Sequence, residues 1–591
     1  MMDKKSLIAI ALITVVILLL PTYYNLIYDK EEMTEPAAQS TQIHEKPTEQ
    51  TTLPAKEKQK PAEQTEKQPV SDISQKPFVA ESETTVSKAE IYNDKIAEKF
   101  ISIETPLISA KLSNQGGGNF EYWHLKEYGT WENTEAKIID ESIHNGLFLT
   151  FLTSDGEKID LNQYRFEPVG TQPQEIQLKG DESFTLTYQV RIKNSLIRKS
   201  LTFFGNAYHI DLVLDMSDAR ELLLNDDYEI GWQKGLPSNE INMVEDYTYS
   251  EAYAQMGGEL EGYEIDSEEK SKPQPINGTV EWIAIRTKYF LTSLIPENIN
   301  TSGVVFGGEG VKVGDVLNRR YNTSLVTTVT EDNLEDSYKI YMGPLEYSVL
   351  SDYNNGLNQL IMNHGWYERT FRPISLLILR VFKFFKLFIP NYGIIIILFS
   401  ILVKILVYPL TKKSYKSMKE MSRVQPLLAE IREKYKSDPQ RLNKETMKLY
   451  KEHGINPMGG CLPMLLQLPL LGALFIVFRS TIQLRGASFI PGWINDLSSA
   501  DTIFTLPFSL PMYGNQFNIL PILMAATMIF QSKMTMQDPK QKAMVYIMPV
   551  FMLLLFNQFP SGLNLYYTMF NLLTIIQQKI TDGNGKKKEN K

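Results

Sequence analysis

The sequence is poor in the residues that build disulfide frameworks and metal centres. Cysteine occurs once in 591 residues, at Cys461, which excludes a disulfide framework within the chain and a cysteine-based metal site. Because Cys461 lies in an apolar run, we interpret it as a small buried hydrophobic residue. The six histidines are scattered, and none has a second histidine at metal-binding spacing. A net charge of −9 argues against a general nucleic-acid binder.

Nucleotide-binding and catalytic motifs are also missing. The glycine run at residues 116–118 lacks the context of a phosphate-binding loop, so we predict a β-turn there. No pairing of a nucleophile with a base stands out. The sequence therefore predicts a protein that is not an enzyme and that holds no cofactor and no metal ion.

Long apolar runs are missing from the middle of the chain and are concentrated at its two ends. The first, Leu7–Leu20, follows Lys4 and Lys5, and no small-residue cleavage site comes after it. We therefore predict an uncleaved signal anchor over residues 1–28, with the lysines holding the N-terminus in the cytoplasm. Residues 29–90 are rich in Pro, Glu, Gln, Lys and Thr and poor in aromatics, which predicts a disordered linker.

Residues 91–350 have the pattern of an all-β sandwich. Short runs that alternate apolar and polar residues, such as Phe184–Val190, Leu201–Phe204 and Ile210–Leu214, are bounded by Gly, Asn and Asp. The region carries a net charge of −20. Large translocated domains are exempt from the positive-inside rule, so this charge is only consistent with a periplasmic location, where the first anchor already places the region.

Residues 351–390 are predicted to form a periplasmic amphipathic helix, with helical spacing over Leu357–Pro390. Arg380, Lys383 and Lys386 fall near one face of this helix. A Phe-rich face combined with Lys and Arg suits the membrane interface, and a core helix of the preceding domain is the alternative. The apolar positions are Ile374, Leu377, Ile378, Val381, Phe382, Phe385 and Phe388.

Five apolar segments follow in residues 391–580 and predict a bundle of transmembrane helices. The first two reach about 20 residues, enough to cross a hydrocarbon core of about 30 Å, and the last three are shorter, which is accommodated by a thinner bilayer. A tight turn at Phe559–Gly562 separates the last two. Together with residues 1–28 they make six spans with both termini in the cytoplasm. The segments are Tyr392–Leu410, Met458–Phe478, Ile519–Phe530, Met544–Phe556 and Leu563–Ile576.

The charges of the intervening loops agree with this orientation. Residues 412–455 would be cytoplasmic, and from Lys412 to Glu452 they contain twelve Lys or Arg and six Asp or Glu. Apolar residues spaced by three to four predict an antiparallel helical hairpin there. The cytoplasmic tail, residues 581–591, is basic. One interpretation is a solvated hairpin whose charges orient the protein, and the other is a docking surface for an acidic partner such as ribosomal RNA.

Lys404 lies inside the first apolar segment, where a lysine near the bilayer centre costs about 2.5–3.5 kcal/mol. Its amine could snorkel to the cytoplasmic headgroups, or it could face a water-filled cavity in the bundle. Ser400 lies one turn away, which favours a polar stripe on this helix. Gln467, Asn564 and Asn571 add polar groups in other segments. Since the five segments contain no Asp or Glu, a cation here could attract acidic residues of a passing polypeptide.

Several motifs in residues 391–580 resemble the YidC family of membrane protein insertases in their order and spacing. The match covers roughly Tyr392–Gln578, whereas the outer β domain resembles the Gram-negative branch in layout only. The resemblance implies a multi-domain membrane protein with a five-helix core, a hydrophilic groove open to cytoplasm and lipid, and a supersandwich-like periplasmic domain. The motifs are Tyr408-Pro-Leu-Thr-Lys, Gln425-Pro, Asn456-Pro-Met-Gly-Gly-Cys-Leu-Pro, Ile547-Met-Pro-Val and Phe559-Pro-Ser-Gly-Leu-Asn-Leu-Tyr-Tyr.

The resemblance also implies site residues. Lys404 takes the place of the arginine usual in the family, and lysine keeps the charge but loses the planar fork of donors. Tyr566 and Tyr567 resemble aromatic groove positions, although an aromatic belt at the membrane surface is their more common role. We expect a substrate groove formed by Lys404, Ser400, Gln467, Tyr566, Tyr567 and Asn571, and a hydrophobic slide formed by Leu468, Leu471 and Leu555.

These expectations describe an insertase and chaperone of a bacterial inner membrane that consumes no nucleotide. Its expected partners are nascent membrane proteins, lipids, the Sec translocon, and the ribosome through the hairpin and the tail. A small-solute transporter is one alternative, but it predicts internal repeats, which the five segments lack. An anchored periplasmic protein that binds or modifies carbohydrate is the other, although an anchor needs one span and not six.

Overall fold

The computed structural model describes residues 96–130, 134–268, 270–297, 301–314, 316–329, 335–455, 462–511, 513–535 and 542–589. The chain divides into two compact units, residues 1–76 and 77–591, and all described residues belong to the second. The predicted signal anchor (1–28), the predicted linker (29–90) and the Asn456–Cys461 part of one motif lie outside the described residues.

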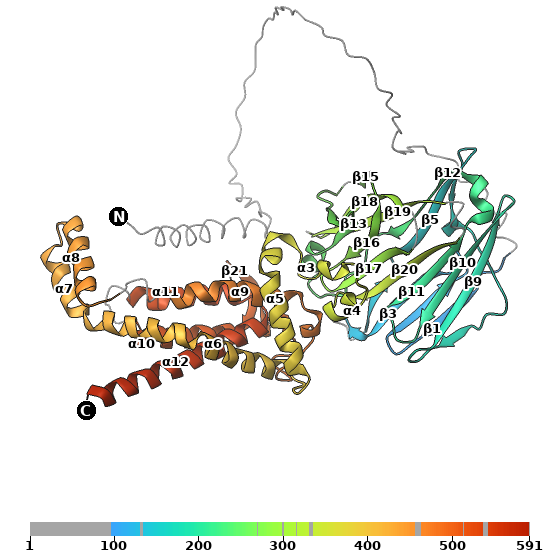
Figure 1. Cartoon of the computed structure of the whole chain (residues 1–591). Coiled ribbons are helices and arrows are strands. Elements are labelled where there is room, and N and C mark those ends of the chain that lie inside the picture. Colours follow the sequence, from blue (N-terminus) through green and yellow to red (C-terminus); the bar gives the residue numbers. More distant parts are fainter. Residues whose placement is uncertain are drawn as a thin grey trace, which may run out of the picture. The chain divides into compact units, whose positions relative to one another are not determined.

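The described residues up to Pro344 form three β-sheets, which confirms the prediction of a β-sandwich domain (Figure 1). The five-stranded sheet has the order β4 (Glu135–Ile139), β3 (Asn119–Gly129), β2 (Ile108–Ser113), β1 (Phe100–Glu104), β8 (Glu175–Gln177). The nine-stranded sheet has the order β14 (Glu259–Tyr263), β13 (Glu251–Met256), β16 (Val280–Arg286), β17 (Phe290–Glu297), β20 (Glu335–Pro344), β11 (His209–Asp215), β10 (Ser195–Phe204), β9 (Ser183–Ile192), β7 (Glu167–Pro168). The six-stranded sheet has the order β15 (Lys270–Asn277), β18 (Thr301–Val313), β19 (Val316–Thr328), β12 (Leu223–Gln233), β5 (Gly146–Thr153), β6 (Lys158–Asp160).

The alternating runs of the sequence set the faces of these strands. In β9, Leu186, Tyr188, Val190 and Ile192 are buried, two residues apart, and the residues between them are more exposed. β9 pairs with β10 in an antiparallel register that begins at Ile192 and Ser195. The period-two pattern therefore predicted parts of both strands correctly, at Phe184–Val190 and Leu201–Phe204.

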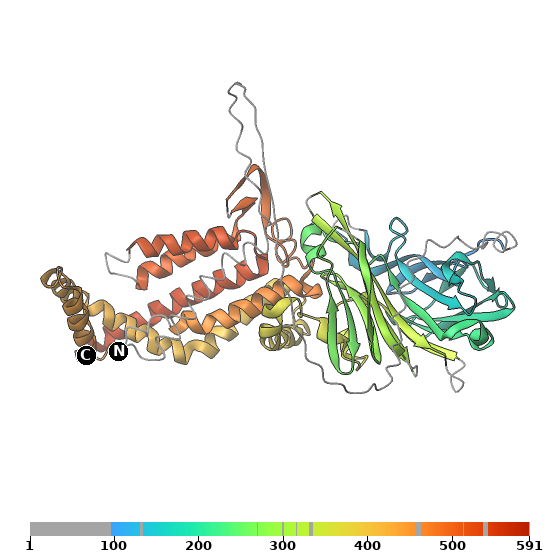
Figure 2. The ribbon, with the colours of Figure 1, turned by 90° about the horizontal axis from the view of Figure 1, so that it is seen from above.

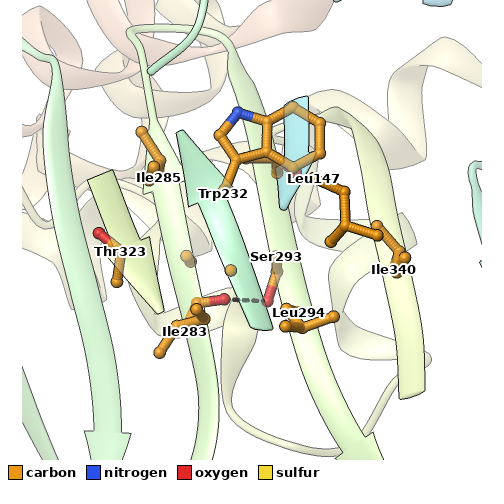
Figure 3. Close-up of a pocket in the computed structure, with 11 residues that line it drawn as sticks. Leu147, Trp232, Ile283, Ile285, Ser293, Leu294, Thr323 and Ile340 are labelled. Atoms are coloured by element: carbon orange, nitrogen blue, oxygen red, sulfur yellow. Dashed lines mark hydrogen bonds between the residues drawn. The ribbon is translucent and has the colours of Figure 1, made fainter. Parts of the chain in front are cut away.

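The interior of the sandwich is closely packed. A cavity of about 10 Å³ lies between the nine-stranded and six-stranded sheets, next to Leu147, Trp232 and Ile340 (Figure 3). The Ser293 hydroxyl beside it donates to the carbonyl of Ile283 at 2.8 Å. Since a single water needs roughly this volume, the cavity belongs to the core and cannot hold a sugar.

The predicted amphipathic helix is present but shorter than predicted. A short helix α4 (Tyr347–Ser351) and a 3₁₀ turn η3 (Leu357–Leu360) come first, and the long helix α5 covers Gly365–Lys386. Positive φ angles at Met362 (53°) and Gly365 (68°) break the helix before α5. Ile378 and Phe382 are buried, and the Ser375 hydroxyl donates to the carbonyl of Ala473 at 3.1 Å.

The five predicted apolar segments are all helical where they are described. They form α6 (Tyr392–Arg423), α9 (Leu462–Ser480), α10 (Leu520–Thr535), α11 (Lys542–Phe556) and α12 (Ser561–Glu589). Within the described part of the chain, one helix, at Tyr392–Pro409, is long and apolar enough to cross a membrane, and the apolar stretches of α9, α10 and α11 are shorter. The count of six spans stays a prediction.

The basic hairpin is confirmed, with one difference. Helices α7 (Gln425–Lys434) and α8 (Pro439–Glu452) pack together around Leu428 and Leu449. The carboxylate of Asp438 caps α8 by accepting from the backbone N–H of Arg441 at 3.0 Å. The first arm, however, begins as an uninterrupted continuation of α6 to Arg423, because no helix-breaking residue follows Pro409 there.

The helices pack in a defined order. α12 lies against α6 and α10, α10 lies against α11, and α5 lies against α9 and α6 (Figures 1 and 2). The remaining elements are short: η1 (Leu161–Gln163), η2 (Ser217–Leu222), α3 (Met243–Thr248), η5 (Ile482–Leu484) and the two-stranded sheet of β21 (Thr502–Leu510) and β22 (Gly514–Asn518).

Candidate functional site

Lys404 is on α6, and its side chain contacts α12. Its side chain is buried, with 7% of the residue exposed. The ammonium Nζ donates to Oγ1 of Thr574 at 2.7 Å and lies 4.6 Å from the centre of the Phe570 ring. An aromatic face attracts a desolvated cation by about 2 kcal/mol. The ammonium group is therefore stabilised inside the bundle by a hydroxyl and a ring, both from α12.

The same face of α6 carries further hydroxyl groups. Ser400 is fully buried and donates to the carbonyl of Ile396 at 2.8 Å. Thr411 is also buried, and its hydroxyl accepts from the side-chain amide of Gln577 at 3.3 Å. Because residues 400, 404 and 411 are four and seven positions apart, they share one face of the helix. The predicted polar stripe on this helix is thus present and faces α12.

The facing stripe on α12 was only partly recognised in the sequence. Asn571 donates to the hydroxyl of Thr527 in α10 at 3.3 Å, and Asn564 donates to the carbonyl of Phe556 at 3.1 Å. The missed residues are Thr574, the partner of Lys404, and Thr568. The signal that would have found them is the spacing of four, three and three positions between residues 564, 568, 571 and 574, which places all four on one helical face.

The two tyrosines lie in the interior of the bundle. Tyr566 is fully buried, and its ring is 5.2 Å from that of Tyr567 and 6.1 Å from that of Phe399. Both hydroxyl oxygens are buried, and that of Tyr567 lies beside the side chain of Gln467 on α9. For the Tyr566 hydroxyl no hydrogen-bond partner lies within the described ranges, and a buried hydroxyl without a partner costs about 1–3 kcal/mol. Because it is fully buried, Tyr566 does not belong to a lipid-facing belt.

The remaining predicted site residues lie on other helices. Gln467, Leu468 and Leu471 are on α9, and Leu555 is on α11. Leu468 is exposed, whereas Leu471 and Leu555 are partly buried against the main core. Lys404 and Ser400 thus lie on α6 and Tyr566 on α12, which packs against α6. The residues of the predicted slide lie on α9 and α11.

A second cluster of charges lies at the end of α9 and was not predicted. Arg479 donates to the carboxylate of Glu245 at 2.6 Å, and Lys288 of the β domain donates to the same carboxylate oxygen at 2.9 Å. Burial raises the pKa of Glu245, but the two cations outweigh burial and hold this pKa at about 2. The carboxylate therefore stays ionised and joins the β domain to α9.

A neighbouring carboxylate extends this joint to α5. Glu368 is fully buried and accepts from the hydroxyl groups of Tyr249 (3.2 Å) and Ser480 (3.0 Å) and from the backbone N–H of His364 (2.8 Å). Its three donors come from the β domain, from α9 and from the start of α5. The outer end of α9 is therefore held on two sides by hydrogen-bonded carboxylates.

Comparison with known proteins identifies both parts of the chain. The family model described as "60Kd inner membrane protein" matches residues 384–588, and the model described as "YidC periplasmic domain" matches residues 100–377. A membrane protein insertase YidC of Prosthecochloris aestuarii is 38% identical over 523 residues, which is 87% of each chain. The one of Pelodictyon phaeoclathratiforme is 36% identical over 81% of this chain and 82% of its own.

A solved structure of the same kind is also similar. The chain described as "Active YidC insertase crystal structure with the first transmembrane domain resolved" is 19% identical, with a TM-score of 0.34. The alignment covers 82% of this chain and 93% of that chain.

Proposed function

This chain belongs to the YidC family of membrane protein insertases of the inner membrane, and we propose that it inserts membrane proteins through a polar groove centred on Lys404. The observation that carries this proposal is the burial of Lys404 between α6 and α12, beside the hydroxyl of Thr574. A buried cation in an otherwise apolar span is costly and therefore points to function.

The first step of the proposed mechanism is the entry of a nascent span with its polar outer segment into the groove. The hydroxyl groups of Tyr566 and Tyr567 and the amide of Asn571 offer hydrogen bonds to that segment. Lys404 attracts its acidic side chains, because opposite charges interact more strongly in a low dielectric than in water. The polar segment thus crosses part of the bilayer without losing all of its polar contacts.

The second step is release of the apolar span to lipid. Leu468, Leu471 and Leu555 provide an apolar path, and partitioning of the span into hydrocarbon supplies the driving force. The membrane potential adds about 2.3 kcal/mol per charge per 100 mV for acidic segments that cross outward. The mechanism requires no nucleotide hydrolysis.

The proposed topology has six spans with both termini in the cytoplasm, and α5 lies in the outer membrane interface. Trp366, Leu377 and Phe384 are exposed on α5, and Phe388 is exposed just after it, while Lys383 is exposed among them. This combination suits a helix at the headgroup boundary. The opposite face of α5 packs on α9, so the helix serves the protein core and the interface together.

We further propose two partners, the ribosome and the Sec translocon. The hairpin of α7 and α8 and the basic tail carry the positive charge expected of a surface that meets ribosomal RNA at the cytoplasmic side. Larger clients would be received from the Sec translocon, with the same groove used for insertion.

The test is insertion of a small single-span client into liposomes that contain the purified chain, scored by protection from protease. We expect the wild-type chain to protect the client above empty liposomes, and Lys404→Ala to protect less. Lys404→Arg, which keeps the charge, should retain protection and serves as the matched control. Protection no greater than in empty liposomes, for several clients, would refute insertion by the chain alone.

A further inference from the structure

The external loop between α9 and α10 contains a β-hairpin without charge. Between Thr502 and Asn518 the sequence has no Asp, Glu, Lys, Arg or His. Strand β21 is exposed along most of its length, with Phe504 51% and Phe508 57% exposed. Ile503 and Leu510 are exposed as well. In Figure 2 the two strands, in orange, stand to one side of the helices. A soluble surface rarely presents so many apolar side chains together.

The hairpin is nevertheless held at its base and at its turn. A carboxylate oxygen of Asp501 accepts from the backbone N–H groups of Ile519 (3.0 Å) and Leu520 (2.8 Å), at the start of α10. The side-chain amide of Asn557, just after α11, donates to the carbonyls of Tyr513 and Gln516 at 2.8 Å each. The strands are therefore fixed to the ends of α10 and α11 and are not a loose loop.

The exposed apolar side chains and the strand edges restrict the environments in which this hairpin is stable. A two-stranded hairpin that exposes apolar residues is marginal in water. The hydrocarbon core is also excluded, because β21 and β22 form a sheet of two strands whose outer edges keep unpaired N–H and C=O groups. The boundary between headgroups and acyl chains satisfies both requirements, since it offers hydrogen bonds to the strand edges and an apolar medium to the phenylalanines.

We infer that the β21–β22 hairpin docks into the outer headgroup region of the membrane in which the chain resides. Two observations select lipid as the occupant. The hairpin is fastened to the ends of two apolar helices, which fixes it near the height of the membrane surface under the proposed topology. It also has no charge with which to recognise a soluble partner. Docked in this way, the hairpin anchors the ends of α10 and α11 at the outer side of the groove.

The test uses single-cysteine variants of the full chain in liposomes, without a client. On a Cys461→Ser background, Phe508→Cys and Leu510→Cys each receive an environment-sensitive fluorophore. Both side chains are exposed on β21, so each checks the other if one variant fails to fold. Val313→Cys, at the end of β18 in the β domain, is the control because Val313 is 43% exposed, as Leu510 is.

Two quenchers then report the surroundings of the label. We expect a nitroxide carried on lipid near the headgroups to quench position 508 more than position 313, and aqueous iodide to quench them in the reverse order. Equal quenching of both positions by iodide, with no effect of the lipid nitroxide, would overturn the inference. A second series of measurements adds a client. If the lipid nitroxide has no effect and the label becomes shielded from iodide only when the client is present, the inference is overturned and the hairpin is a surface for clients. Since the readout needs no insertion, its failure is distinguishable from failure of the proposed function.

Discussion

Two buried lysines in this protein each lie beside an aromatic ring but donate to different groups. Lys288 in the β domain is 5% exposed, lies 4.9 Å from the ring centre of Tyr289, and donates to a carboxylate, that of Glu245. Lys404 in α6 is 7% exposed, lies 4.6 Å from the ring centre of Phe570, and donates to a hydroxyl, that of Thr574. Each lysine thus has an aromatic face, and the difference is the charge of the oxygen it meets.

The difference separates a structural charge from one that we assign to function. A carboxylate neutralises Lys288, and with Arg479 it holds the β domain to α9. A hydroxyl leaves the formal charge of Lys404 in place, so the approach of an acidic side chain improves its energy. The same residue type therefore joins two parts of the protein in one setting, and we propose that it attracts a client in the other.

The largest effect is expected from neutralising Glu245, the carboxylate that Lys288 contacts. Glu245→Gln removes the carboxylate charge that Lys288 and Arg479 share, and breaking a buried ion pair costs about 3–5 kcal/mol. Since the pairs join the β domain to α9, we expect a clearly lower unfolding temperature of the full chain in detergent. The measurement is thermal unfolding followed by circular dichroism.

The control for this variant is Glu268→Gln. Glu268 lies 3.4 Å from Lys312, and both side chains are more than half exposed, so its loss should change stability by less than about 1 kcal/mol. Equal unfolding temperatures for Glu245→Gln and Glu268→Gln would mean that the buried pair contributes no more than a surface pair.

Acid should reproduce part of this effect without a mutation. The folded-state pKa of Glu245, about 2, lies below its ordinary value of 4.5. The ionised carboxylate therefore contributes stability that is complete above pH 4.5 and is lost as the pH falls towards 2. We expect the unfolding temperature of the wild type to fall more steeply over this range than that of Glu245→Gln. Parallel curves for the two proteins would contradict the low pKa.

An effect of intermediate size is expected at Lys404. Lys404→Ala should lower insertion of a client with acidic residues in its outer segment by about tenfold, which corresponds to about 1.4 kcal/mol. The same variant should insert a client whose acidic residues are replaced by Asn and Gln nearly as well as the wild type does. Protease protection with the two clients measures both effects. An equal loss for both clients would assign Lys404 a structural role like that of Lys288.

Much of the fold could be predicted from the sequence because it rests on local periodicity. The alternation of apolar and polar residues predicted strands within β9 and β10, and the apolar segments around Lys404 and Asn564 predicted α6 and α12. The start of α5 could not be predicted, because the helix is interrupted by the positive φ angle of Met362, and a methionine in the sequence does not indicate that conformation. The β21–β22 hairpin was also missed, since it lies inside what the sequence presents as an external loop.

In the candidate site, the sequence predicted residues within single helices but not the contacts between helices. Lys404 and Ser400 stand out within one apolar span, but Thr574 lies 170 positions further along the chain, and its hydroxyl is common in helices. The joint of Glu245 with Arg479 connects residues 234 positions apart, and each alone looks like an ordinary surface charge. Such pairs are decided by tertiary packing, which a one-dimensional pattern does not contain.

The smallest effect is expected at the hydroxyl that meets Lys404. Thr574→Val keeps the shape of the side chain and removes two hydrogen bonds, one to its own helix and one from Lys404, and each is worth about 1 kcal/mol. Thr568→Val is the matched control, because both hydroxyls donate to the carbonyl four residues earlier, at 2.7 Å from Thr574 and 2.8 Å from Thr568, and Thr574 in addition accepts from Lys404. We expect Thr574→Val to change insertion of the acidic client by a few-fold at most and Thr568→Val to leave it unchanged. If the two variants behave alike, Thr574 acts only on the helix backbone, and the ammonium of Lys404 is positioned by the Phe570 ring instead.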